Sequence, residues 1–399
     1  MSITIHRGAN QIGGCVTEIS TEKARVFIDL GADLTDEKDS PIDIDGLTTG
    51  NAQNSHLLIT HYHGDHIGRI KQTVKDIPIY MGEITKKIAM EIATRTANTE
   101  TLKVLEKAKT FKPGHKLTFG DIKVTTYTID HSAFDAYCFL IEAKGKRIFY
   151  TGDFRLHGAK GKGMLENGFF EKYINENGSK VTDYMICEGT NISKKENAEP
   201  ESELLRKAMK LFANQKHKYV FILCSSTNID RIMVFYHAYN KVFDKKRPFI
   251  VRDRYNYQAE ILKIISESQG EKCEFYNFEP SEASAKDGYC RLIRCNKEGE
   301  GILKRCFAEH PDDSLIIYSM WKGYLDENNP ARDKKLIEFL KPYKDKYECL
   351  HTSGHADIKT IQNVVNIINP KHIIPIHTES PEEFKKLFKN ALLKTHVEW

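Results

Sequence analysis

The sequence lacks any Cys-x-x-Cys pair, although nine cysteines are scattered over its 399 residues. An odd and unpatterned number of cysteines excludes a secreted fold held by disulfides and predicts reduced thiols in a cytoplasmic protein. Cys138, Cys187 and Cys224 lie in apolar, strand-like runs, so we expect them to fill the core.

Long apolar runs are also missing. Residues 1–7 contain no hydrophobic segment of a signal peptide, and no uninterrupted stretch reaches the length of a membrane span, so we expect no membrane partner. The net charge of +4 is compatible with a polyanionic substrate but too small to argue for one. No internal repeat or low-complexity segment is present. With 40% hydrophobic and 29% charged residues, the chain is typical of a globular protein with about two domains.

The most informative stretch is residues 60–68, which read Thr-His-Tyr-His-Gly-Asp-His-Ile-Gly. It follows the apolar run 56–60, a pattern that predicts a buried strand leading into a tight loop and then a helix. Imidazole and carboxylate are the ligands of hydrolytic metal sites. The alternative is a loop of solvated histidines that bind nothing. The candidate ligands are His61, His63, Asp65 and His66.

Two further candidate ligands follow strand-like runs, His131 after 122–129 and Asp153 after 147–151. Asp29 follows the run 26–28 in the same way, as a candidate for the site that is not itself a ligand. Ligands at strand ends are held by a rigid sheet beside open loops. For Asp29, an equally weighted interpretation is that it only caps the following turn. His115 and His157 match no ligand pattern.

Elsewhere the patterns predict a short helix over 67–75 and a long amphipathic helix over 83–109. The composition becomes polar at 193–197, after which strands and helices alternate, so we expect a second α/β domain with a parallel sheet. Residues 269–300 show no functional pattern.

The order His-x-His-x-Asp-His at 61–66, with Thr-Gly-Asp at 151–153, resembles the signature of the metallo-β-lactamase-fold hydrolases. Ser-Gly-His-Ala at 353–356 and Pro-Ile-His-Thr-Glu at 375–379 resemble motifs B and C of their β-CASP nuclease branch, and Glu188 fits motif A. The resemblance implies an α/β fold in which an αββα metallo-β-lactamase sandwich is interrupted by an α/β β-CASP domain. The expected divisions are 1–195 for the first part of the sandwich, 196–335 for the β-CASP domain and 336–399 for the return.

Within this branch the chain looks most like RNase J-type enzymes, because residues 224–231 resemble their Ser/Asn-x-x-Arg segment. Two departures are visible. Residues 320–324 read Met-Trp-Lys-Gly-Tyr in place of a Ser-rich stretch, and the chain ends soon after motif C, as a catalytic core would. Trp321 and Tyr324 are expected either to stack on bases or to pack in the core.

The resemblance implies two divalent metals, zinc first and manganese as the alternative. One would be held by His61, His63 and His131, the other by Asp65, His66 and His377, with Asp153 bridging them. A hydroxide activated by both metals would attack the phosphodiester. The implied catalytic residues are Asp65, His355 on the phosphate, Glu188 holding His355, and Asp29 orienting ligands from behind. The alternative interpretation of His355 is a structural histidine buried in the core.

A phosphate cradle is predicted around the start of the helix at 230–242, with plain N-capping as an equally weighted alternative. The residues of the predicted cradle are Ser225, Ser226, Asn228 and Arg231. Two further residues, Ser353 and Gly354, are predicted to contact the substrate. The predicted function is a metal-dependent nuclease of single-stranded RNA, acting from the 5′ end or internally, and a histidine at 377 favours RNA in this family. The alternatives are a DNA-processing β-CASP nuclease and a small-molecule metallohydrolase. A non-catalytic subunit is disfavoured because all seven ligands are present, and a homodimer is left open.

Overall fold

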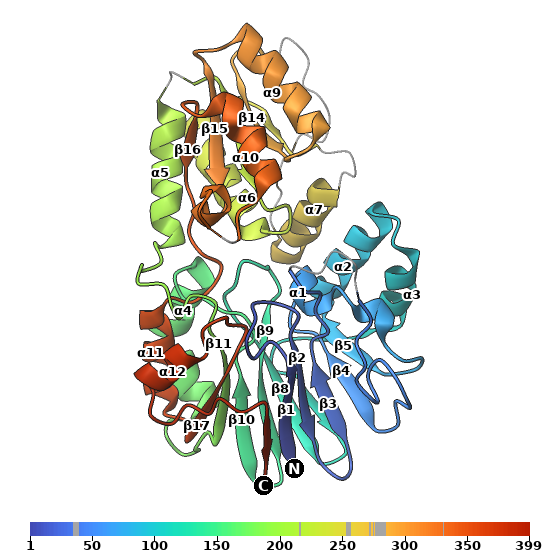
Figure 1. The fold of residues 1–399 in the computed structure, drawn as a ribbon. Coiled ribbons are helices and arrows are strands. Elements are labelled where there is room, and N and C mark those ends of the chain that lie inside the picture. Colours follow the sequence, from blue (N-terminus) through green and yellow to red (C-terminus); the bar gives the residue numbers. More distant parts are fainter. Residues whose placement is uncertain are drawn as a thin grey trace. The chain divides into compact units, whose positions relative to one another are not determined.

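The computed structural model describes residues 1–34, 40–214, 217–252, 257–270, 273, 275, 285–329 and 331–399. It divides into two compact units, one formed by Met1–Ala198 with Gly354–Trp399 and the other by Glu199–Ser353 (Figure 1). The chain therefore leaves the first unit, builds the second and returns.

The first unit contains two sheets whose inner faces share one core. The seven-stranded sheet has the order β18 (His396–Glu398), β1 (Ser2–Arg7), β2 (Val16–Ser20), β3 (Arg25–Ile28), β4 (Ser55–Leu58), β5 (Ile79–Gly82) and β6 (Lys109–Phe111). The six-stranded sheet has the order β17 (His372–Ile376), β11 (Tyr184–Glu188), β10 (Lys146–Tyr150), β9 (Tyr137–Ala143), β8 (Ile122–Thr128) and β7 (Lys116–Phe119). Apolar residues from both, such as Ile28 and Ile186, form a single buried cluster.

Helices cover the outer faces of this sandwich (Figure 1). On the first sheet lie α2 (Glu83–Arg95) and α3 (Thr99–Lys107), and on the second lie α4 (Ala159–Glu166), the π-helical turn η2 (Phe170–Ile174), α11 (Ile358–Ile368) and α12 (Glu382–Leu387). The predicted αββα layering is thus confirmed. The returning segment contributes β17 to the second sheet and β18 to the first, where it pairs with β1.

Two helix predictions were wrong. The expected single helix over 83–109 is two helices, because Ala97 adopts a left-handed backbone (φ 56°) and the Asn98 side chain caps α3 by accepting from the Thr101 amide. The helix expected over 67–75 begins earlier, as α1 (Gly64–Ile67), and a 3₁₀ turn, η1 (Ile70–Gln72), follows it.

The second unit is built on a five-stranded sheet in which every pair is parallel, as the alternating pattern predicted. The strand order is β13 (Phe249–Ile250), β14 (Tyr289–Ile293), β12 (Tyr219–Cys224), β15 (Ser314–Ser319) and β16 (Tyr347–Cys349). Its helices include α5 (Glu201–Ala213), α6 (Ile229–Phe243), α7 (Tyr257–Gln269), α9 (Lys297–Glu309), η3 (Lys322–Leu325), α10 (Lys334–Leu340) and η4 (Lys341–Tyr343). Strand β14 lies within 269–300, the stretch in which the sequence showed no functional pattern.

The second unit ends after residue 353, later than the expected change at 335. The reason is packing. Leu336 and Leu340 of α10 and Tyr343 of η4 are buried in the core of this unit, and β16 extends its sheet beside β15. At the N-terminal end of the second unit, the boundary between Ala198 and Glu199 lies close to the boundary expected at 195.

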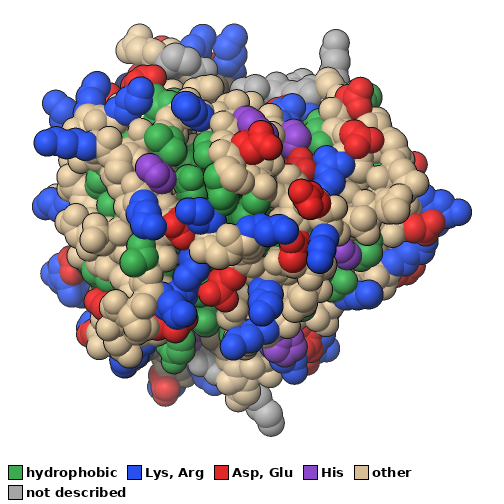
Figure 2. Space-filling view, turned by 90° about the horizontal axis from the view of Figure 1, so that it is seen from below, with side chains coloured by type: hydrophobic (Ala, Val, Ile, Leu, Met, Phe, Trp, Pro, Cys, Tyr) green, Lys and Arg blue, Asp and Glu red, His purple; other side chains and the backbone are tan. Residues whose placement is uncertain are grey.

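Charge is mixed over the face seen from below, which carries lysine and arginine side chains interspersed with carboxylates (Figure 2). On this face the small positive net charge of the chain does not collect into one patch. Among the described residues, no helix combines the length and the apolar character that a membrane span requires.

Candidate metal centre

The predicted ligands, and Asp29 with them, follow strands that end at the same edge of the sandwich. Asp29 follows β3, and His61 lies just beyond β4, which runs parallel to β3. In the second sheet Asp153 follows β10 and His377 follows β17, and both strands run parallel to β11. His131 lies beyond β8, which points the same way as β10 because both are antiparallel to β9. Because these strands run in the same direction within each sheet, they bring residues from distant segments to one edge of the sandwich.

The backbone around the centre is unusual in three places. Asp29 (φ 64°) and His377 (φ 51°) adopt the left-handed conformation, which costs free energy for residues other than glycine and recurs at functional sites. Gly31 lies so close to the histidine loop that an added Cβ would fall 1.7 Å from the Asp65 carbonyl oxygen. Only glycine lets the loop 61–66 lie directly against the segment after β3.

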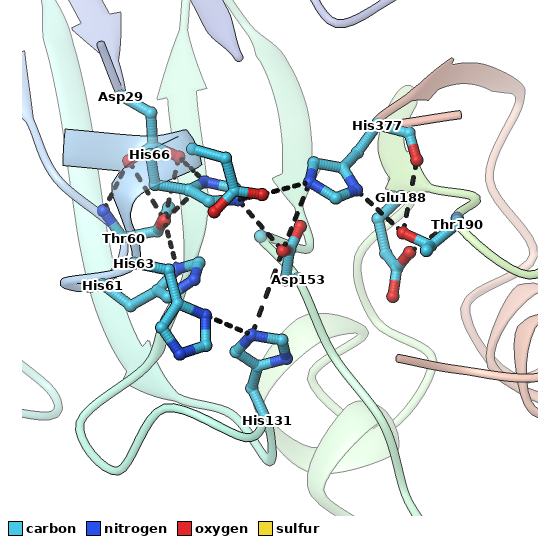
Figure 3. A network of polar contacts seen from close by, with 12 residues as sticks. Asp29, Thr60, His61, His63, His66, His131, Asp153, Glu188, Thr190 and His377 are labelled. Atoms are coloured by element: carbon cyan, nitrogen blue, oxygen red, sulfur yellow. Dashed lines mark hydrogen bonds and ion pairs between the residues drawn. The ribbon is translucent and has the colours of Figure 1, made fainter. Parts of the chain in front are cut away.

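Three histidines form the first donor group: His61, His63 and His131, whose candidate ligand atoms all lie within 4.8 Å of one another (Figure 3). The His131 Nδ1–H donates to the Gly354 carbonyl oxygen at 2.8 Å, since a carbonyl can only accept. This leaves a lone pair on His131 Nε2, which faces His63 Nδ1 at 3.3 Å. His61 Nδ1 contacts the Thr60 hydroxyl at 3.0 Å.

The second donor group consists of Asp65, His66, Asp153 and His377. His66 Nδ1–H donates to Asp29 Oδ2 at 2.8 Å, and its Nε2 lies 2.9 Å from Asp153 Oδ2. His377 Nε2 lies 3.2 Å from Asp65 Oδ2 and 3.5 Å from Asp153 Oδ2. The Asp153 carboxylate is thus the point on which both groups converge, because it also lies 3.9 Å from His131 Nε2.

Asp29 is buried behind the ligands and does not join either donor group. Its carboxylate accepts from the Thr60 amide at 2.7 Å and from the Thr60 hydroxyl at 2.8 Å, besides the His66 ring. This geometry fits the orienting role that the resemblance implied.

Burial controls the protonation of the first group. It lowers the pKa of His63 to about 4 and the pKa values of His61 and His131 well below their usual range, so these rings are neutral at pH 7. Burial alone would also lower the pKa of His66, but Asp153 and Asp29 raise it. Burial would raise the pKa of Asp153, yet His377 and His66 hold it well below its ordinary value. The result is three neutral imidazoles in the first group, and a His66 ring whose protonated form is stabilised beside the Asp153 carboxylate.

These residues fit divalent cations. Neutral imidazole and carboxylate are the donors that zinc takes in hydrolytic sites, and manganese accepts the same set. The buried Nε2 of His61 has no hydrogen-bond partner among the described residues, an arrangement that costs free energy unless a ligand is bound there. The residues of the two donor groups are those expected from the sequence, and the number of cations that they hold stays a prediction.

Beside the donors, His355 and Glu188 form a pair. His355 Nδ1 lies 3.2 Å from Glu188 Oε1, and 3.8 Å from Asp153 Oδ2. Burial would lower the pKa of His355, but Glu188 and Asp153 raise it. Glu188 is fully buried and also accepts from the amides of Ala356 and Thr190, so it is firmly held. His355 is partly exposed, at 21% of its side chain, as contact with a substrate requires.

His355 also lies within reach of the metal donors, since its ring nitrogen groups with His131 and Asp153. The geometry therefore admits a role as a ligand as well as the expected role on the phosphate. Gly354 contributes its carbonyl oxygen to the His131 ring, a supporting contact that the sequence did not suggest.

The predicted phosphate cradle lies in the second unit, and two of its residues serve the fold there. Asn228 caps α6 by accepting from the Arg231 amide, which is the N-capping alternative. The Arg231 guanidinium is fully buried and donates to Glu201 and to the Thr352 carbonyl oxygen. Ser225 is exposed and Ser226 partly exposed, so these two remain candidates for contact with a ligand.

Trp321 and Tyr324 contact each other edge to face, with ring centroids 5.3 Å apart. Trp321 also covers Gly323, where an added Cβ would fall 2.3 Å from its ring. Tyr324 is 38% exposed, so it is not a core residue.

Sequence reasoning missed Thr190 and Asn191. The Thr190 hydroxyl lies 2.8 Å from His377 Nδ1 (Figure 3). It also lies 3.1 Å from His355 Nδ1. The Asn191 amide donates to the carbonyl oxygens of His355 and Ala356. Their position directly after Glu188 was the only signal available.

Comparison with known families gives two matches. Residues 25–167 match the β-lactamase superfamily domain, and residues 344–397 match the Zn-dependent metallo-hydrolase RNA specificity domain. The first contains most of the predicted ligands, and the second contains Gly354, His355 and His377. Fold, donor set and family matches define the chain as a metal-dependent hydrolase with the metallo-β-lactamase fold and an inserted β-CASP region.

Within this class the chain is ribonuclease J-like. It is 23% identical to ribonuclease J of Mycoplasma pneumoniae over 93% of this chain and 67% of that protein, and 23% identical to ribonuclease J of Helicobacter pylori over 95% of this chain and 56% of that protein. An archaeal relative, "Probable RNase MJ4" of Methanocaldococcus jannaschii, is 21% identical over 95% of this chain and 93% of that protein. A crystal structure of a protein of unknown function from Enterococcus faecalis V583 shares the fold, with a TM-score of 0.75, 21% identity and 99% of each chain covered.

Proposed function

We propose that this protein is a metal-dependent nuclease that hydrolyses phosphodiester bonds of single-stranded RNA, with two divalent cations held by the two donor groups. The observation that carries the proposal is the pair His355–Glu188 placed beside Asp153, where both donor groups converge. A small-molecule hydrolase would need the donors but not a separate buried acid–histidine pair. RNA is favoured over DNA because the match to the RNA specificity domain includes both His355 and His377.

The bound cations would activate the attacking water and neutralise charge on the phosphate. Residues of the chain would hold the ligand rings in place and orient His355. Asp29 holds the His66 ring through Nδ1, and the Gly354 carbonyl oxygen holds the His131 ring in the same way. Glu188 orients His355, whose Nε2 is then available to donate a proton to the leaving oxygen or to stabilise the phosphate.

The direct test is degradation of matched RNA and DNA oligonucleotides by enzyme reconstituted with zinc or with manganese. RNA cleavage that requires metal and that disappears in His355→Ala supports the proposal. DNA cleavage at the same rate points to the alternative of a DNA-processing β-CASP nuclease. Hydrolysis of a lactam or thioester without nucleolysis would overturn the proposal.

We further propose that RNA with a 5′ monophosphate is the preferred substrate and is shortened from that end, with the hydroxyls of Ser225 and Ser226 as phosphate contacts. Ser225→Ala with Ser226→Ala should then reduce the preference for the 5′ monophosphate over the 5′ hydroxyl. Equal rates on both RNAs, unchanged in the double variant, would instead identify an endonuclease.

A further inference from the structure

One hydroxyl group contacts two different histidines of the centre. Thr190 Oγ1 lies 2.8 Å from Nδ1 of His377, a predicted ligand, and 3.1 Å from Nδ1 of His355, the predicted substrate-side residue. It also lies 3.4 Å from the His377 carbonyl oxygen. None of the roles assigned above uses this residue.

The proton count decides how these contacts are made. A threonine hydroxyl has one proton to donate and two lone pairs that accept. If it donated to His355 Nδ1, that nitrogen would carry a lone pair facing Glu188 Oε1 at 3.2 Å, and two acceptors would repel each other. For His377 the proposed cation decides, because a ring that binds a cation through Nε2 carries its proton on Nδ1. Both Nδ1–H groups then face the Thr190 oxygen, His355 shares its proton between Thr190 and Glu188, and the hydroxyl proton is directed to the His377 carbonyl oxygen.

This arrangement determines what the histidines present to the centre. With Nδ1 protonated, the lone pair of His377 lies on Nε2, the atom that faces Asp65 and Asp153. Metal-binding histidines commonly donate their second ring N–H to such an acceptor, which fixes the tautomer and the ring orientation. His66 and His131 receive the same support from Asp29 and Gly354, and Thr190 supplies the equivalent contact to His377.

The position of Thr190 is itself well defined. Its amide donates to Glu188 Oε2 at 2.9 Å, and the side chain of the next residue, Asn191, donates to the His355 carbonyl oxygen at 3.2 Å. Gly189 before it lies against Phe384, where an added Cβ would fall 2.5 Å from the ring. The turn 188–191 thus holds the hydroxyl, the carboxylate and the His355 backbone together.

We infer that Thr190 is a positioning residue that accepts hydrogen bonds from both His377 and His355 and holds them in the Nδ1–H tautomer. This inference rests on the proposed two-cation site, but not on RNA as the substrate. Thr190→Val keeps the shape of the side chain and removes the acceptor. It should lower the affinity for one of the two zinc ions by about 10–100-fold. Thr190→Ser, which restores the hydroxyl, should bind both with affinities close to the unmodified protein.

The experiment is a competition titration with a zinc chelator on the full chain, with circular dichroism as a check of folding. Thr126→Val is the matched control, because Thr126 is a buried threonine of β8 whose hydroxyl donates to the Lys112 carbonyl oxygen at 2.7 Å, away from the donors. The control should bind both ions normally.

Unchanged affinity for both ions in Thr190→Val would overturn the inference. An equal loss of zinc affinity in Thr190→Val and in the control Thr126→Val would also overturn it. If Thr190→Val does not fold, Thr190→Ala against Thr190→Ser provides the same comparison. Binding of fewer than two zinc ions by the unmodified protein would instead refute the proposed two-cation site, so the two failures are distinguishable.

Discussion

The His131 ring donates a hydrogen bond to the carbonyl oxygen of Gly354, which lies 223 positions later in the chain. Gly354 is the first residue of the segment that returns to the first unit. A backbone group of the returning segment therefore orients His131, a predicted ligand in the N-terminal segment of the same unit. Any change that shifts this carbonyl should act on the metal and not only on the fold.

Gly354→Ala tests this link. An added Cβ would fall 2.5 Å from Ser132 Oγ and 2.9 Å from Ser132 Cβ, so the backbone must shift. We expect zinc affinity at the group of three histidines to fall about 10–100-fold, measured by chelator competition. The double variant with Ser132→Gly removes the clash and should recover most of the loss, and affinity unaffected by Gly354→Ala would refute the link.

Asp153→Asn should affect both ions. The carboxylate lies 2.9 Å from His66 Nε2 and 3.5 Å from His377 Nε2, and an amide lacks the charge that a bridging ligand supplies. Metal analysis of the folded variant should find at most one ion, and turnover should be lost. Asp183→Asn, a carboxylate beside the start of β11 that pairs with Lys371, is the control and should retain both ions.

His355→Ala separates the role on the substrate from a role as a ligand. If His355 acts on the phosphate, the variant should keep both ions while turnover falls about 10²–10⁴-fold, the usual contribution of a proton-transfer residue. His115→Ala, at an exposed histidine outside the centre, should match the unmodified enzyme. Loss of an ion in His355→Ala would place this ring in the coordination shell.

Glu201→Ala should destabilise the second unit. Arg231 is fully buried and its guanidinium donates to Glu201 at 2.8 Å, so removing the carboxylate leaves a buried charge without its counterion. We expect a loss of about 3–5 kcal/mol in the free energy of unfolding, measured by urea denaturation. Glu203→Ala on the same helix removes only an exposed pair with Arg206 and should change the midpoint little.

Replacing both partners, as Arg231→Met with Glu201→Leu, should recover much of the stability, because no unpaired charge is then buried. If Glu201→Ala and Glu203→Ala destabilise the protein equally, the buried pair has no special role.

The sequence alone was sufficient for the fold class and for the set of candidate ligands. The spacing of His61, His63, Asp65 and His66 is local, and an apolar run before each ligand predicts a strand end. The sandwich itself was implied by the resemblance of residues 61–66 and 151–153 to the metallo-β-lactamase-fold hydrolases. The structure brings all seven candidates together, and whether they hold two metals stays a prediction for the experiments above.

Only the tertiary structure decided which groups support those ligands. The Gly354 carbonyl oxygen lies beside His131 although 223 positions separate the two residues. The contact of the Thr190 hydroxyl with His377 depends on the parallel pairing of β11 with β17, in which Glu188 lies opposite Ile376. Strand register between distant segments is not encoded in a periodicity of 2 or 3.6 residues along the chain. The same holds for Arg231, whose charge predicted a surface contact with phosphate and whose burial beside Glu201 became visible only once α5 and α6 were packed together.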